Sequence, residues 1–264
     1  MTDRFWLLLS TFCFLASFGY TLFALRAGSF LPSRFNLAAV AVGFVLQTTF
    51  LYQRGHAIGR CPLTNLFEVF IFVSWSMTLI YMIVGTAYRL SLMGAFTSPV
   101  AFFIQAIALA LPIDTPAGPR GKVNPWLEFH ASFSIIACGA FLLAGVAGLM
   151  YLVQDRQLKR HTLGSLFYRL PPISQLAIAN RRLVFFGFVL LTFGIGAGFF
   201  IGLPLNSLKL GLSIFIWVMY AAILWGRSWK ALAPRSLASA SVLAFGVVLV
   251  TLWGVTLLSG GTPR

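Results

Sequence analysis

Charged residues are scarce in this sequence, and their scarcity excludes an ordinary soluble protein. Only 9% of the 264 residues are Asp, Glu, Lys or Arg, while 59% are hydrophobic. Soluble domains carry about 25% charged residues, and a water-soluble core does not absorb this much apolar surface. The composition therefore predicts an integral membrane protein whose apolar surface is solvated by lipid.

Acidic residues are especially few, and the usual catalytic motifs are missing. Five Asp and Glu stand against 19 Lys and Arg, and the sequence contains no P-loop, no HExxH, no GxSxG and no paired carboxylates. A hydrolase or an ion-coupled pump would have few groups to work with. We therefore predict no catalytic residues and no catalytic activity of the chain on its own.

Cysteine pairs are missing as well. Cys13, Cys61 and Cys138 are too far apart for a CxxC dithiol or for a CxxCH site of covalent haem attachment. Cys13 and Cys138 fall inside apolar runs and are expected to be small core residues, whereas Cys61 falls in a loop.

Long apolar runs are what the sequence has in abundance. A helix needs about 20 mostly apolar residues to cross a bilayer. The candidate spans are residues 5–25, 36–53, 65–86, 91–112, 126–153, 183–204, 208–226 and 236–258. The run with Gln47 and Thr48 is the weakest, and Pro99 is expected to kink or split the fourth. Because the runs lack the alternation of membrane strands, the predicted fold is all-α, a bundle of about eight transmembrane helices that forms a single domain over residues 1–264.

The basic residues predict how these spans are oriented. Twelve Lys and Arg lie on one side and seven on the other, and the richer side is expected to be cytoplasmic. Both termini and the loops 54–64, 113–125 and 205–207 then lie outside. Because the charges sit between apolar runs, they indicate topology and not nucleic-acid binding. The long basic loop 154–182 is interpreted as a connector, with a docking or lipid-surface segment as the alternative.

Two of the apolar runs carry small residues at every fourth position. They are Gly194, Gly198 and Gly202 in one run, and Ala140, Ala144 and Gly148 in the other. Small residues at this spacing let helix backbones approach closely. Close packing is the favoured interpretation, and a slot for a flat ligand is the alternative.

His130 is the histidine best placed to bind a metal. Asn124 suits a helix N-cap and Pro125 the first helical position, so His130 is expected near the start of the fifth span, at the outer membrane interface, beside Trp126 and Phe133. A neutral imidazole there is a competent axial ligand for haem iron. The alternative is an interfacial histidine bonded to a carbonyl or to water, which spacing alone favours.

Glu68 lies at the outer end of the third predicted span. Intramembrane acids are costly and often functional. With Asn65 as the N-cap, however, Glu68 is the third helical residue and can reach back as in a capping box. Both interpretations are open. Glu128 either bonds to a neighbouring imidazole or suits the helix N-terminus.

Two segments resemble a known family. Residues 59–68 read Gly-Arg-Cys-Pro-Leu-Thr-Asn-Leu-Phe-Glu, and Trp75 follows. They look like the third-span entry of cytochrome c assembly proteins of the CcsA/ResC type, roughly G-x-x-P-x-x-N-x-[FY]-E. Residues 125–130 read Pro-Trp-Leu-Glu-Phe-His and resemble the family's helix that opens with an outer histidine.

A third and weaker match concerns the seventh span. Lys209, Trp217 and Tyr220, followed by residues 224–227, look like the corresponding span of the smaller YpjD-like and HemX-like relatives. The chain is therefore expected to be closest to these small members.

The resemblance implies an eight-span bundle that handles haem and presents it on the outer face for attachment to apocytochrome c. In such a protein His130 would be the first outer histidine ligand. The chain departs from the family because residues 202–209 contain no tryptophan, where haem-handling members have a tryptophan-rich loop. The second outer histidine, which would flank that loop, is missing too, and His56 is on the right side to substitute for it.

From this resemblance we predict a shallow haem site at the outer ends of spans three, five, six and seven. The candidate cofactor-binding residues are His130, Trp126, Glu68, Lys209, Arg60 and His56. His130 would ligate the iron. The basic members of the set, together with Arg120 and Lys122, are expected to pair with haem propionates, and Trp126 is expected to cover the macrocycle.

The predicted function is that of a membrane component of cytochrome c biogenesis, at most one part of a haem lyase system. Its expected partners are membrane lipid, other assembly proteins and apocytochrome c, and its expected location is a bacterial-type cytoplasmic membrane. The alternative is a non-catalytic scaffold or regulator of haem synthesis or of a cytochrome assembly complex, which the missing tryptophan loop favours. A small-solute transporter is less favoured, because the sequence shows no inverted repeat of four spans.

Overall fold

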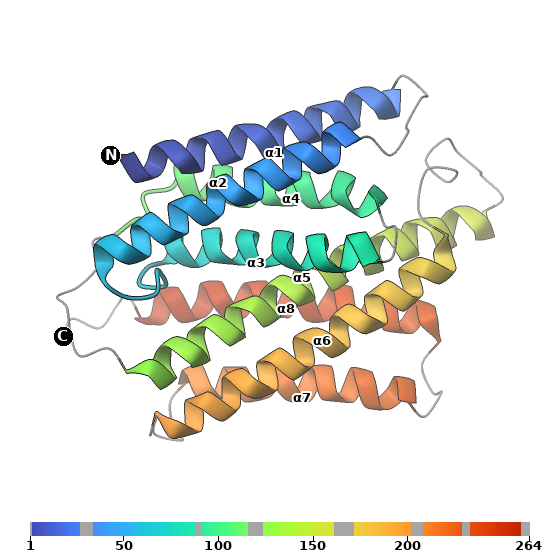
Figure 1. Cartoon of the computed structure of the whole chain (residues 1–264). Coiled ribbons are helices and arrows are strands. Elements are labelled where there is room, and N and C mark those ends of the chain that lie inside the picture. The colour runs from blue at the N-terminus through green and yellow to red at the C-terminus, as the bar shows by residue number, and fades with distance from the viewer. Residues whose placement is uncertain are drawn as a thin grey trace. The chain divides into compact units, whose positions relative to one another are not determined.

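Eight α-helices make up the part of the chain that the structure describes, which confirms the all-α prediction. This computed structural model describes residues 2–26, 34–87, 91–115, 124–160, 172–201, 208–228 and 233–259. The helices, labelled in Figure 1, are α1 (Thr2–Arg26), α2 (Arg34–Ile58), α3 (Leu66–Ala87), α4 (Ser91–Ala110), α5 (Pro125–Lys159), α6 (Ile173–Phe200), α7 (Leu208–Ser228) and α8 (Pro234–Ser259). Each of the eight predicted spans coincides with one helix.

Five of these helices are long and apolar enough to cross a membrane. They are α1, α2, α3, α5 and α6, of which α5 and α6 are the most hydrophobic. The other three contain shorter apolar stretches, Phe96–Ala110 in α4, Gly211–Gly226 in α7 and Pro234–Val250 in α8. This pattern is that of a polytopic membrane protein.

The basic segment 154–182 is much less of a loop than predicted. α5 continues to Lys159, and α6 already begins at Ile173, so Arg181 and Arg182 are helical. Basic side chains favour the C-terminal end of a helix, as in the last turn of α5, and Pro172 directly precedes α6. The remaining centre of the predicted loop, with His161, lies outside the described residues.

The chain divides into two compact units. Unit 1 comprises Met1–Lys122 and Arg156–Pro172 and contains α1 to α4; unit 2 comprises Val123–Asp155 and Ile173–Arg264 and contains most of α5 together with α6 to α8. Each unit is considered by itself below.

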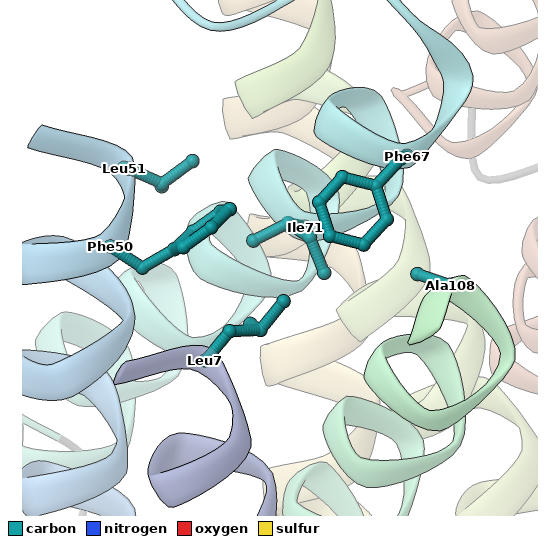
Figure 2. Packing of buried hydrophobic residues seen from close by; sticks show 6 residues of the cluster. All are labelled: Leu7, Phe50, Leu51, Phe67, Ile71 and Ala108. Carbon is teal, nitrogen blue, oxygen red and sulfur yellow. The ribbon is translucent and has the colours of Figure 1, made fainter. Parts of the chain in front are cut away.

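The end of unit 1 that holds the start of α1 and the end of α2 is filled by hydrocarbon. Its core cluster consists of Leu7, Phe50, Leu51, Phe67, Ile71 and Ala108, contributed by all four helices. Figure 2 shows these side chains pointing toward one another. The rings of Phe50 and Phe67 meet edge to face at 6.1 Å, a favoured aromatic geometry. This end of unit 1 is therefore a closed apolar plug.

Two polar residues of α2, the weakest predicted span, bond to α3. Gln47 donates to the carbonyl of Ile71 at 2.8 Å. The hydroxyl of Thr48 accepts the indole N–H of Trp75 at 2.8 Å. Helix–helix hydrogen bonds of this kind allow polar groups inside a membrane, and they explain why α2 forms despite its composition.

A segment of α2 recurs in α6. Residues 36–48 read Asn-Leu-Ala-Ala-Val-Ala-Val-Gly-Phe-Val-Leu-Gln-Thr, and residues 180–192 read Asn-Arg-Arg-Leu-Val-Phe-Phe-Gly-Phe-Val-Leu-Leu-Thr. The Asn, the first Val and the run Gly-Phe-Val-Leu-x-Thr are the same in both. The identity alone could be accidental, so its meaning depends on the contacts.

The glycine of each copy packs against a phenylalanine of the preceding helix. A Cβ on Gly43 of α2 would lie 3.2 Å from the ring of Phe14 in α1. A Cβ on Gly187 of α6 would lie 2.6 Å from the ring of Phe141 in α5. The same close approach of two helices therefore occurs in both units.

The threonine and phenylalanine of each copy clasp a tryptophan of the following helix. In unit 1 the indole of Trp75 donates to Thr48 and stacks on Phe44 with centroids 5.6 Å apart. In unit 2 the indole of Trp217 donates to Thr192 at 2.9 Å and stacks on Phe188 at 5.2 Å. The equivalent pairs are Phe44 and Phe188, Thr48 and Thr192, and Trp75 and Trp217.

Two further contacts extend the match to the first and fourth helices. Asn36 bonds to Ser17 in unit 1, and Asn180 donates to the carbonyl of Ala144 in unit 2 at 2.7 Å. Phe103 of α4 packs on Phe18 of α1, and Phe245 of α8 packs on Gly145 of α5.

We conclude that α1 to α4 and α5 to α8 are two versions of one four-helix unit. The repeat is direct, not the inverted one sought in the sequence, and it lets residues of the two units be compared position by position.

Candidate functional site

The start of α5 is built as the sequence predicts. The side chain of Asn124 accepts the backbone N–H of Trp126 at 3.1 Å, and the carbonyl of Asn124 accepts the N–H of Leu127 at 3.0 Å. Pro125 occupies the first helical position. An N-cap and a proline at this place fix where a helix begins, and they put His130 in its second turn.

His130 is held in a cradle formed by α6. Its Nδ1 lies 2.7 Å from the carbonyl oxygen of Gly194. A Cβ on Gly198, one turn further along, would come within 3.1 Å of the same Nδ1. Gly198 thus gives the imidazole its space, and Gly194 supplies the carbonyl and lets Ser134 approach, so the small-residue stripe serves close packing and also shapes this site.

The hydrogen bond of His130 determines its tautomer. A carbonyl oxygen only accepts, so Nδ1 carries the proton, and Nε2 of the neutral ring keeps its lone pair. Among the described residues Nε2 has no hydrogen-bond partner, and the side chain is half-buried. Metal-binding histidines usually donate their second ring nitrogen to a carbonyl in this way. The structure thus shows the carbonyl bond of the alternative interpretation. The same bond leaves the lone pair of Nε2 available, so a role of His130 as a metal ligand stays a prediction.

The layer around His130 has small side chains at two positions where unit 1 has its plug. In the repeat, Gly194 corresponds to Phe50, and Ser134 corresponds to Leu7. The hydroxyl of Ser134 is buried with no hydrogen-bond partner, and a Cβ on Gly194 would meet it at 2.8 Å. Unit 2 thus has glycine and serine at two positions where the plug of unit 1 has large apolar side chains.

An aromatic groove runs along the same ends of α5 and α6. It has a volume of about 410 Å³ and is lined by Trp126, Phe129, Phe133, Thr192, Phe193, Gly196, Ala197 and Phe200. Trp126 stacks on Phe200 with centroids 4.7 Å apart. The volume lies within the range of small-molecule sites. His130 does not line this groove; it follows Phe129 on α5 and faces the glycines of α6.

The predicted propionate partners are only partly described. Lys209 lies in the first turn of α7 and corresponds in the repeat to Phe67 of the plug. Arg120 and Lys122 lie outside the described residues, as does Gly202.

Glu68 has the capping role that the sequence allowed. Its backbone N–H donates to the side chain of Asn65 at 2.8 Å, and its Oε2 accepts both the N–H and the hydroxyl of Thr64 at 2.7 Å. Its Oε1 accepts Nε of Arg54 at 2.9 Å, and the carboxylate is fully buried. A role of Glu68 in cofactor binding stays a prediction.

Arg54 and Asp114 complete an ion cluster above the plug of unit 1. Arg54 bonds to Asp114 at 2.6 Å, and Arg4 reaches the other oxygen of Asp114 at 2.6 Å. Asn65 also donates to Asp114 at 3.1 Å. The charge pattern of the sequence predicted only a topological role for Arg4 and Arg54 and no role for Asp114. A lone acid at a span end is a signal of such pairing.

The two remaining candidates, His56 and Arg60, also belong to unit 1. His56 is exposed in the last turn of α2 and lies beside Tyr52, with ring centroids 6.3 Å apart. Arg60 is half-buried and follows Gly59, whose φ of 73° ends the helix in the left-handed conformation. The structure thus brings His130 and Trp126 to one end of unit 2 and places Glu68, His56 and Arg60 in unit 1.

Within the described residues no three His, Cys, Asp or Glu side chains come together as a metal centre. A single imidazole at a membrane interface suits a metal that brings its other ligands with it, as haem iron does.

Fold and site define a polytopic helical membrane protein with a lone, oriented interfacial histidine. The chain matches the family described as "Cytochrome C assembly protein" over residues 63–262. It therefore belongs to this family, and the resemblance seen in residues 59–68 and 125–130 is confirmed.

Several relatives share this assignment over most of the chain. The chain is 28% identical over 277 residues to the cytochrome c biogenesis protein CcsA of Porphyra purpurea, covering 85% of this chain and 84% of the relative. It is 28% identical over 278 residues to that of Pyropia yezoensis. It is 34% identical over 141 residues to that of Trichormus variabilis, covering 50% of this chain and 40% of the relative. The chain is a membrane component of cytochrome c biogenesis, and this family role implies the handling of haem.

Proposed function

We propose that this chain binds haem at the outer end of unit 2 and presents it there for cytochrome c assembly, with His130 as the iron ligand. The observation that carries the proposal is the imidazole of His130, whose Nδ1–H is fixed by the Gly194 carbonyl at 2.7 Å. This bond leaves Nε2 as the one lone pair that the ring can offer to a metal.

The repeat supports the same end of unit 2. Unit 1 closes its outer end with Leu7, Phe50 and Phe67, whereas unit 2 has Ser134, Gly194 and Lys209 at these positions. A four-helix unit of this design is stable with a solid plug, so the small and polar residues of unit 2 are not required by the fold. They fit a place where a ligand enters.

Haem would be the cargo of this site and would supply the iron that His130 ligates. The residues of the chain would provide binding and orientation. Lys209, at the start of α7, would pair with a propionate. Trp126 and Phe129, which are 46% and 54% exposed, would cover apolar parts of the macrocycle. With one histidine among the described residues of this unit, the second axial position would stay open for a ligand from a partner. The outer face corresponds to the extracytoplasmic side of a bacterial-type membrane, and apocytochrome c is the expected acceptor.

The test is a haem titration of the purified chain, followed by visible absorbance. The wild type is expected to give a Soret band that is lost or shifted in His130→Gly and restored when free imidazole is added, because imidazole can occupy the vacated space. His56→Ala is the matched control and is expected to keep at least part of the wild-type signal. A His130→Gly spectrum identical to that of the wild type would refute the ligand assignment.

A second candidate function is a non-catalytic scaffold or regulator of haem synthesis or cytochrome assembly. The lack of tryptophan in residues 202–209 favours it. In that case the wild type gives no Soret band, yet deletion of the gene still lowers the amount of cytochrome c in cells.

A further inference from the structure

The two units differ most in the polarity of their interiors. Among the described residues, fourteen buried polar or charged side chains belong to unit 1 and three to unit 2. Because the units share one design, unit 2 shows what the fold itself needs. The excess in unit 1 therefore calls for another reason, and intramembrane polar residues are often functional.

Five of these fourteen residues, on α1, α2, α3 and α4, are here called the glutamine layer. In unit 1 it consists of Ser10, Thr11, Gln47, Ser74 and Gln105, all buried. The equivalent residues of unit 2 are Ala137, Cys138, Leu191, Ile216 and Val247. Every polar side chain of the layer thus has a counterpart without a hydroxyl or amide.

The hydrogen bonds inside this layer are incomplete. Thr11 donates to Oε1 of Gln105 at 2.8 Å, and Ser10 donates to the carbonyl of Gly43 at 2.8 Å. The amide nitrogen of Gln105 reaches the hydroxyls of Ser10 and Ser74 only at 3.4 and 3.5 Å, which is long for a hydrogen bond.

The clearest gap lies on Gln47. Its amide nitrogen donates to Ile71, but its Oε1 is buried and has no partner. A buried acceptor without a partner costs about 1–3 kcal/mol. The layer thus combines one empty acceptor with a donor, on Gln105, that is only loosely satisfied.

We propose that the glutamine layer is a binding site for water inside the membrane-spanning part of unit 1. Water offers two donors and two acceptors, so it can donate to Oε1 of Gln47 and can bond to the amide of Gln105. A buried water needs two to four polar partners, and this layer supplies them without any charge. The equivalent positions of unit 2 carry no hydroxyl or amide group, so we expect no water to be bound at them.

Native Cys138 provides a matched internal control, because it is the equivalent of Thr11. Replacement of Cys13 and Cys61 by Ala leaves Cys138 as the reporter of unit 2. Further replacement Cys138→Ala together with Thr11→Cys creates a reporter in the glutamine layer. The rate of S–H to S–D exchange in D₂O, followed by the infrared S–H band, then reports contact of each thiol with water.

The reporter at position 11 is expected to exchange at least ~10-fold faster than Cys138, because exchange in a dry interior must wait for local opening. Adding Gln47→Leu and Gln105→Val introduces the residues of unit 2 and should lower the rate to that of Cys138. The same double substitution should leave the unfolding temperature unchanged or raise it. The proposal would be overturned by equal S–H exchange rates at the two reporters, or by a fast rate at position 11 that persists in the double substitution.

A second pair of cysteine reporters keeps the test possible if the Thr11→Cys variant does not fold. Ser74→Cys and Ile216→Cys are equivalent positions on α3 and α7 and should show the same difference in rate. If the double substitution Gln47→Leu and Gln105→Val instead lowers the unfolding temperature strongly, the layer serves helix packing without water and the proposal is wrong.

Discussion

Alanine substitution of the two equivalent glycines, Gly43 and Gly187, should have very different effects. A Cβ on Gly187 would lie 2.6 and 2.8 Å from ring atoms of Phe141. This ring cannot retreat, because it is 1% exposed and stacks on Tyr220 with centroids 3.6 Å apart and planes 6° apart. The closest atoms to a Cβ on Gly43 lie at 3.2 and 3.3 Å, so a shift of a few tenths of an ångström suffices.

The magnitude follows from two opposing terms. Overpacking of a tight core costs about 1–3 kcal/mol, and the approach at Gly187 belongs at the upper end. Replacing a helical glycine by alanine gives back about 1 kcal/mol of helix propensity. Gly187→Ala should therefore lose about 1–2 kcal/mol, while Gly43→Ala should be close to neutral. Gly246, which has no atom within 4 Å of a Cβ, should gain up to about 1 kcal/mol as alanine.

The assay is thermal unfolding of the detergent-solubilised protein, followed by circular dichroism. For a chain of this size 1 kcal/mol corresponds to about 2–4 °C, so Gly187→Ala should unfold about 2–8 °C below the wild type. Gly43→Ala is the control for a mild packing contact, and Gly246→Ala measures the gain in helix propensity alone. If Gly187→Ala proved as stable as Gly43→Ala, the close contact with Phe141 and the reasoning from it would be wrong.

Two further predictions concern the ion cluster and the tryptophan clasps, and both are checked by the same unfolding assay. Arg54→Leu removes the cation that is bonded to the buried carboxylate of Glu68 and should cost about 3–5 kcal/mol of unfolding free energy. The side chain of Arg4 is 52% exposed, so Arg4→Leu should cost less than about 1 kcal/mol. Similar losses in the two variants would argue against a buried cluster. Trp75→Phe and Trp217→Phe should each lose about 1 kcal/mol with the indole hydrogen bond, and a large effect of only one of them would contradict the equivalence of the two clasps.

The helices were predictable from the sequence because hydrophobic length decides them. The start of α5 could also be placed, since Asn124 and Pro125 act locally. The end of α5 and the start of α6 were missed, because polar and basic residues continue a helix beyond the apolar stretch that a span needs. Because Arg181 is charged, it was predicted to lie in the loop, although this residue lies in α6.

The site was predictable only in part. The position of His130 followed from its helix, but its tautomer depends on the carbonyl of Gly194, which lies 64 residues away in the sequence. The direct repeat left a visible signal in the shared Gly-Phe-Val-Leu-x-Thr run, yet six residues prove little until the contacts agree. As a lone acid at a span end Asp114 signals an ion pair, but its partners Arg4 and Arg54 lie 110 and 60 residues away in the sequence, so the sequence does not identify them.

The comparison of the units narrows where a ligand as large as haem can enter. In unit 1 the end beside His56 holds the plug of Phe50, Phe67 and neighbours, and the ion cluster of Arg54 lies above it. Entry there would require both to be displaced, at the cost of buried ion pairs. In unit 2 the stacked rings of Phe141 and Tyr220 close the middle, and Gly194 and Ser134 occupy positions of the plug. We therefore expect a ligand of that size to enter unit 2 at the end that holds His130, and not unit 1 at its plugged end, whatever the second axial ligand is.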